Sequence, residues 1–135
     1  MSEPHIIINP EALAPPIGFA HAVVAGAGRL VHLGGQAALD ASGRLVGEDI
    51  AAQFDQAASN VVTALGAANG LPEHLVSLHI YVTDVSAYRA ALPELSSIYQ
   101  RHFGRHYPAI ALFGVTELFE PAALVELVAV AVVPG

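Results

Sequence analysis

The segment Leu124–Val133 constrains the fold most, because it is an almost unbroken run of valine, leucine and alanine. It is far too short to cross a membrane as a helix, and such a run is typical of a strand buried on both faces. It therefore predicts the central strand of a sheet. Glu126 is the one charged residue in it, on the same face as Val128 and Val130. A carboxylate there is costly unless it has a role, so Glu126 is a candidate functional residue. The alternative is a carboxylate at the strand edge that faces solvent or pairs with an arginine.

The rest of the chain predicts an α+β domain over residues 1–135, because helical and strand periodicities follow one another without a linker or repeat. Pro93 falls inside the second predicted helix and indicates an extended first turn or a kink. We expect the following elements: a hairpin of strands Ala20–Ala25 and Leu30–Gly34, a short edge strand within Leu39–Val46, a helix beginning after Asp49, a strand at Leu75–Val82, a helix at Tyr88–Phe103, and strands at Ala109–Val115 and Leu124–Val133.

The low charge content predicts a partner for the second face of this sheet. Charged residues make up 13% of the chain and hydrophobic residues 54%, whereas about 25% charged is usual. Two helices can cover only one face. We therefore expect another subunit of the same chain to cover part of the other face.

The charge balance also disfavours several partners and chemistries. The chain has no lysine and a formal charge of −7, so nucleic acids and anionic membranes are not expected partners. It has no cysteine, which excludes disulfides, thiolate metal sites and a cysteine nucleophile. The opening Met1–His5 has no basic region before its short apolar run, and we expect a cytoplasmic protein.

The histidines give no strong metal signal. His102 and His106 are four residues apart and share a helical face, but no third ligand lies near them in the sequence. His21 and His32 fall on neighbouring strands of the predicted hairpin, where they are either cross-strand neighbours lining a cleft or structural histidines. We therefore expect no metal.

The order of several short motifs resembles the Rid superfamily, the reactive intermediate deaminases also called the YjgF family. The resemblance covers about residues 9–133 and rests on the segments Leu13–Ala22, Val31–Gln36, Gly47–Gln53, Val82–Val85, Tyr107–Ala109 and Ala123–Leu127. It implies a Rid-type, chorismate-mutase-like fold: a six-stranded mixed sheet with two helices on one face. It also implies a homotrimer with active sites in the clefts between subunits.

The resemblance further implies a chemistry without a cofactor. Archetypal members hydrolyse enamines or imines of 2-amino acids to the keto acid and ammonia. An arginine clamps the substrate carboxylate, and a glutamate on the last strand positions the attacking water. In this chain the corresponding catalytic residue is Glu126. The substrate-binding positions are Phe19 in place of a tyrosine, Gly34 in place of a serine, Ser96 in place of an asparagine, Ile110 in place of the arginine, and Tyr107 beside the cleft.

Ile110 changes the expected substrate, because isoleucine cannot bind a carboxylate. Arg105 or His106 could supply another cation, or both could be solvated residues that complement the end of a helix. We therefore hold two hypotheses. The protein hydrolyses an imine or enamine other than a simple 2-imino carboxylate, or it is a non-catalytic module that binds an apolar small molecule between subunits. Descriptions of relatives as endoribonucleases fit this acidic chain poorly.

Overall fold

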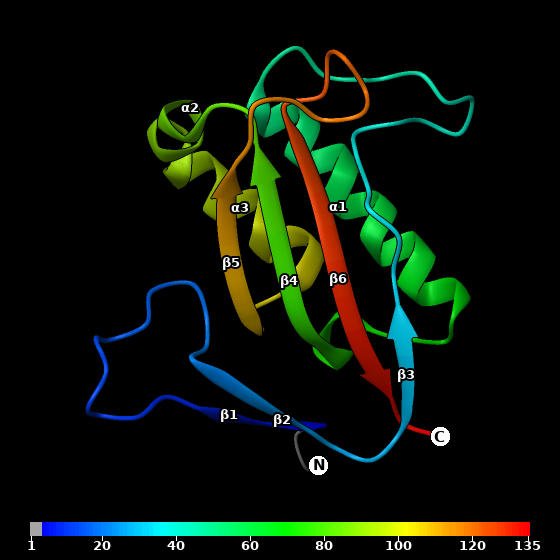
Figure 1. The fold of residues 1–135 in the computed structure, drawn as a ribbon. Coiled ribbons are helices and arrows are strands. Elements are labelled where there is room, and N and C mark those ends of the chain that lie inside the picture. Colours follow the sequence, from blue (N-terminus) through cyan, green and yellow to red (C-terminus); the bar gives the residue numbers. More distant parts are fainter. Residues whose placement is uncertain (1–3) are drawn as a thin grey trace.

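The computed structural model describes residues 4–135, which form the six strands and three α-helices of Figure 1. In chain order they are β1 (His5–Ile8), β2 (Ala22–Ala25), β3 (Arg29–His32), α1 (Ile50–Ala67), a 3₁₀ turn (Pro72–His74), β4 (Leu75–Val82), α2 (Val85–Ala90), α3 (Leu92–Phe103), β5 (Ala109–Gly114) and β6 (Val125–Val133). Within this part of the chain no helix is long and apolar enough to cross a membrane.

The predicted central strand is confirmed. The main sheet has the order β3-β6-β4-β5, so β6 lies between two neighbours and is flanked by β4 over most of its length. β4 pairs with β5 in parallel, and the other pairs of this sheet are antiparallel. The α+β class with a mixed sheet is therefore as expected. The six strands divide into this sheet and a separate β1-β2 ribbon.

The helices cover one face of the main sheet (Figure 1). α1 begins after Asp49, whose side chain accepts a hydrogen bond from the backbone N–H of Ala52, a standard N-cap. Its apolar stripe, including Phe54 and Val61, is completely buried against the sheet. The second predicted helix is two helices that meet at Ala91, with Pro93 in the first turn of α3, where its missing N–H costs nothing.

The opposite face of the sheet is not covered by these helices. Alternation along β6 places Glu126 and Val128 on this open face, where they are half-buried. Leu30 and Phe113 share the face by strand register and are 61% and 43% exposed. A single copy thus leaves large apolar side chains in water on this side.

The predicted hairpin is wrong. β2 pairs with β1, a strand that we did not predict, and β3 pairs with β6. Gly26 and Gly28 do not form a hairpin turn between β2 and β3. A Cβ at Gly26 would clash with the Pro4 carbonyl, and a Cβ at Gly28 with the Val133 carbonyl, so each glycine allows a close approach to a different segment.

The expected edge strand within Leu39–Val46 is reduced to one isolated bridge between Leu39 and Leu45. The turn at its centre is as expected: the Asp40 carboxylate accepts hydrogen bonds from the backbone N–H groups of Ser42 and Arg44. The turn occupies most of the residues between Leu39 and Leu45, so few residues are left to pair as strands.

Candidate functional site

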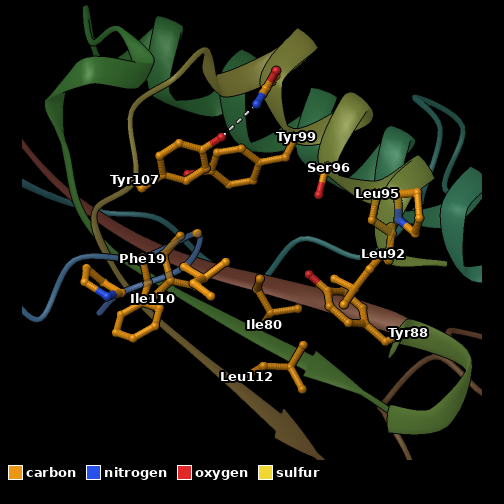
Figure 2. Close-up of a pocket in the computed structure, with 15 residues that line it drawn as sticks. Phe19, Ile80, Tyr88, Leu92, Leu95, Ser96, Tyr99, Tyr107, Ile110 and Leu112 are labelled. Atoms are coloured by element: carbon orange, nitrogen blue, oxygen red, sulfur yellow. Dashed lines mark hydrogen bonds between the residues drawn. The ribbon is translucent and has the colours of Figure 1, made fainter. Parts of the chain in front are cut away.

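A cavity of about 870 Å³ lies between α2, α3 and the β4–β5 side of the sheet, within the range that holds small organic ligands. Figure 2 shows the side chains that surround it. The cavity is lined by Pro16, Ile17, Gly18, Phe19, Ile80, Tyr88, Leu92, Pro93, Leu95, Ser96, Tyr99, Gln100, Tyr107, Ile110 and Leu112.

The secondary structure explains why these side chains converge. Ile110 and Leu112 on β5 are register partners of Leu78 and Ile80 on β4, which face the helices. They form the floor of the cavity, because side chains two residues apart on a strand point to the same face. The spacing of Leu92, Ser96 and Tyr99 places one face of α3 above this floor (Figure 2).

The polar groups of the cavity are held by a small network. The rings of Tyr99 and Tyr107 stack with centroids 5.1 Å apart and an interplanar angle of 7°. The Tyr99 hydroxyl donates to the backbone carbonyl of His106 at 2.7 Å. Gln100 Nε2 donates to the Tyr107 hydroxyl at 2.9 Å, the dashed line in Figure 2. These bonds fix the aromatic end of the cavity.

The lining residues carry no formal charge. Burial, together with the neighbouring Tyr107 and Tyr88, raises the pKa of the Tyr99 hydroxyl far above its usual value of 10.0. Burial also raises the pKa of Tyr88. Both phenols therefore stay neutral at physiological pH, and the cavity offers hydrogen bonds but no ionic partner.

The structure brings four of the six residues singled out from the sequence into this cavity: Phe19, Ser96, Tyr107 and Ile110. Ile110 occupies the floor beside Phe19, and Ser96 lies above on α3 (Figure 2). Ser96 is exposed, and among the described residues its hydroxyl forms no hydrogen bond with another protein group. It is therefore available to a ligand.

Glu126 and Gly34 do not line the cavity. Glu126 is the register partner of Tyr81, which alternates with the inward-facing Ile80 and so faces the open side of the sheet. Its carboxylate lies against Gly35: a Cβ on that glycine would stand 3.0 Å from Glu126 Cδ. Within residues 4–135 this carboxylate has no hydrogen-bond or ion-pair partner. One copy thus presents the cavity on one face of the sheet and Glu126 on the other.

Neither proposed substitute for the arginine reaches the cavity. Arg105 is exposed after the end of α3 and does not line it. His106 Nε2 donates to the Leu75 carbonyl at 2.8 Å, and His102 contacts the Asp55 carboxylate at 2.5 Å. The two histidines thus have separate partners, and neither lines the cavity.

His21 and His32 are not cross-strand neighbours. His21 directly precedes β2 and His32 ends β3, and these two strands lie in different sheets. His21 Nε2 donates to the Ala14 carbonyl at 2.7 Å, and its ring packs edge-on against Phe19. This histidine therefore holds the segment that carries Phe19 into the cavity.

The sequence reasoning missed the far half of the cavity. Its residues Tyr88, Leu92 and Leu95 come from α2 and the first turn of α3, and Ile80 and Leu112 come from the floor. The one signal in the sequence was the apolar spacing of Leu92, Leu95 and Tyr99, which is equally typical of a helix face packed in a core.

Fold and cavity together define a class: an α+β domain with a mixed sheet, helices on one face, and an uncharged ligand-sized cavity at the outer strand. The family model described as Endoribonuclease L-PSP matches residues 9–133, and the chain belongs to this family, the Rid or YjgF superfamily.

Similar proteins cover most of the chain. The Rid-family protein YyfB from Yersinia pestis, described as of unknown function, is 36% identical and covers 96% of this chain and 99% of its own, with a TM-score of 0.87. A YjgF/YER057c/UK114 family member from Mycobacterium tuberculosis is 30% identical over 96% and 99% of the two chains, with a TM-score of 0.65. The mitochondrial protein MMF1 of Saccharomyces cerevisiae is 26% identical over 106 residues, 78% of this chain and 70% of its own.

Proposed function

We propose that this protein hydrolyses an uncharged imine, or an enamine through its imine tautomer, in a cleft that two copies of the chain complete. The observation that carries the proposal is Ile110 on the floor of a cavity whose lining residues carry no charge. The family resemblance implies a carboxylate-binding arginine at this position. Family membership supplies the reaction class, and the cavity supplies the substrate preference.

The preference follows from the cost of burying a charge. A carboxylate that enters the cavity loses its hydration and meets Ile110, Phe19 and neutral phenols, none of which compensates for that loss. An uncharged ligand has no such cost, and it can bond to the free hydroxyl of Ser96. A buried charge left without its partner costs about 3–5 kcal/mol, which corresponds to a discrimination of about 10²- to 10³-fold between charged and uncharged ligands.

The proposal requires a second copy because of the position of Glu126. This carboxylate is on the open face of the sheet, whereas the cavity lies on the helical face. A ligand in the cavity of one copy can therefore meet Glu126 only from a neighbouring copy. The exposed apolar side chains of the open face, such as Leu30 and Phe113, support contact between copies there, and the family resemblance implies a trimer.

The chemistry of such a cleft is general base catalysis. The Glu126 carboxylate accepts a proton from water while the water oxygen bonds to the imine carbon, and the protonated carboxyl then gives this proton to the nitrogen, so that a neutral carbinolamine forms. In the second step the carboxylate accepts the proton of the carbinolamine hydroxyl as the C=O bond forms and the C–N bond breaks, and this proton passes to the departing nitrogen. The products are a carbonyl compound and ammonia, so imine and water balance without a cofactor.

The variant Glu126→Gln tests this proposal, because glutamine keeps the shape and removes the proton acceptor. We expect ammonia release from a panel of uncharged imines to fall by at least about 10²-fold, with oligomeric state and melting temperature nearly unchanged. Full activity in the variant would remove Glu126 from the mechanism.

The second candidate function is a binding module without catalysis, favoured by the apolar lining of the cavity. It predicts no turnover of any imine by the wild-type protein and an apolar small molecule that co-purifies, detected by native mass spectrometry. Catalytic turnover by the wild-type protein, lost in Glu126→Gln, decides against it.

Two further parts of the proposal concern partners and location. The chain has no lysine and a charge of −7, which supports a small-molecule substrate over RNA despite the description of the family model. A cytoplasmic location is the expectation, although the relative MMF1 is named as mitochondrial. Fractionation of the native cell distinguishes the two compartments.

A further inference from the structure

The cavity is longer than hydrolysis of a small imine requires. Phe19, Tyr107 and Ile110 lie at one end and Tyr88 and Leu92 at the other (Figure 2). From Leu92 to Tyr99 the cavity follows seven residues of α3, which corresponds to about 10 Å at 1.5 Å per residue. A volume of about 870 Å³ is in the upper part of the range for ligands of drug size.

The far half of the cavity is apolar on both sides. Ile80 and Leu112 form its floor, and Leu92 and Leu95 lie above them (Figure 2). Tyr88 closes this end with its ring packed edge-on against Phe54 at 6.5 Å between centroids. An alkyl or aryl group fits these walls, whereas a hydrated group would lose its water without replacement.

The polar contacts are concentrated toward the other half. Ser96 offers an unpartnered hydroxyl near the middle, and the Gln100–Tyr107 pair lies at the Phe19 end. A ligand that fills the cavity can therefore form hydrogen bonds at the Phe19 end, whereas the Tyr88 end offers mainly apolar contacts.

We propose that the natural ligand has two parts: a compact uncharged polar head at Ser96 and Ile110, and an extended apolar tail that reaches Leu92 and Tyr88. This inference rests on the proposed function of the cavity as the ligand site and specifies its substrate class. It makes the far half of the cavity the determinant of specificity, because each methylene that enters it adds apolar burial.

A series of straight-chain alcohols from 1-butanol to 1-octanol tests the inference by calorimetric titration of the wild-type protein. The hydroxyl represents the uncharged head and the alkyl chain the tail. We expect the affinity to rise about fourfold for each added CH₂ group, the factor that complete burial of a methylene provides.

Two variants test the orientation. Leu92 is 44% exposed at the start of α3, so Leu92→Glu should fold, and it places a charge beside the tail. It should weaken binding increasingly as the alkyl chain lengthens, so that the gain in affinity from 1-butanol to 1-octanol is lost. Ser96→Ala should weaken all the alcohols by a similar factor. Leu71 is an exposed leucine outside the cavity, and Leu71→Glu is the matched control, with affinities equal to those of the wild type.

The outcomes separate this inference from the proposal on which it rests. If no alcohol binds, the cavity is not a ligand site, and both fail. If the alcohols bind but their affinity does not depend on chain length, or does so equally in Leu92→Glu, the inference is overturned while the cleft remains a ligand site. A segment of a neighbouring copy that fills the far half of the cavity would likewise make the affinity independent of chain length.

Discussion

Gly35→Ala is a sharp probe of Glu126, because it displaces the carboxylate without changing its chemistry. The Cβ of the alanine would stand 3.0 Å from Glu126 Cδ and 3.3 Å from Cγ, and closer still to Oε2. Carbon atoms in contact are about 3.5–4.0 Å apart. The carboxylate must therefore move by about 0.5–1 Å. Its side chain is half-buried and flexible, so it can rotate away.

A displacement of about 1 Å can reduce the rate of a well-oriented reaction by about 10²-fold, or about 2.7 kcal/mol in activation free energy. The stability should change much less. Replacement of glycine by alanine at a compatible backbone angle stabilises by about 0.4–1 kcal/mol, which offsets a comparable cost of an unfavourable Glu126 rotamer. We expect a turnover loss of about 10²-fold with a melting temperature within a few degrees of the wild type.

The assay is ammonia release from the best uncharged imine substrate, with Gly66→Ala as the control. Gly66 lies in α1, and a Cβ there meets no atom within 4 Å. Gly35→Ala introduced into the Glu126→Ala variant should cause no further loss of turnover, because the carboxylate that it displaces is absent there. Wild-type turnover in Gly35→Ala, or an equal loss in the Glu126→Ala background, would refute the argument.

Three further outcomes follow from the structure. Hydrogen bonds from His102 and Arg101 hold the pKa of the Asp55 carboxyl below its ordinary value of 3.8. These hydrogen bonds therefore stabilise the fold at pH values above 3.8, and their contribution is lost as the pH falls through the lowered pKa. Asp55→Asn should thus reduce stability by under about 1 kcal/mol at pH 7, and urea unfolding should show the difference disappearing in acid. Phe54 is 1% exposed, so Phe54→Ala should lower the free energy of unfolding by about 3–5 kcal/mol, measured by the same urea unfolding. Sedimentation at micromolar concentration should show a trimer, and a monomer would contradict the proposed cleft.

Local patterns predicted the elements of the fold better than their pairing. The alternation in β6 correctly grouped Glu126 with Val128 and Val130 on one face of the strand, and the helical periodicity after Asp49 identified α1. Strand partners depend on segments far apart in the chain. The buried His5 shows this: its Nδ1 accepts from the Gly26 N–H and its Nε2 donates to the His74 carbonyl at 2.9 Å. No local pattern predicts such a three-way contact, so β1 was missed.

The candidate site divided in the same way. The motifs identified Phe19, Ser96 and Ile110, which the fold brings together in one cavity. The separation of Glu126 from that cavity depends on which face of the sheet the helices cover. The far half of the cavity, lined by Tyr88 and Leu92, depends on the break between α2 and α3. Pro93 indicated the break, but the space beneath it is a property of tertiary packing.

The most direct test of the proposed substrate class compares two imines that differ only in charge. The kcat/KM for 2-iminopropionate and for its uncharged amide would be measured by ammonia release from the wild-type protein. An uncharged cavity floored by Ile110 predicts that the amide is preferred by about 10²- to 10³-fold, the factor that corresponds to an unpaired buried charge. Equal or faster hydrolysis of 2-iminopropionate would show that a cation reaches the cleft, and it would contradict the central claim that this site selects an uncharged ligand.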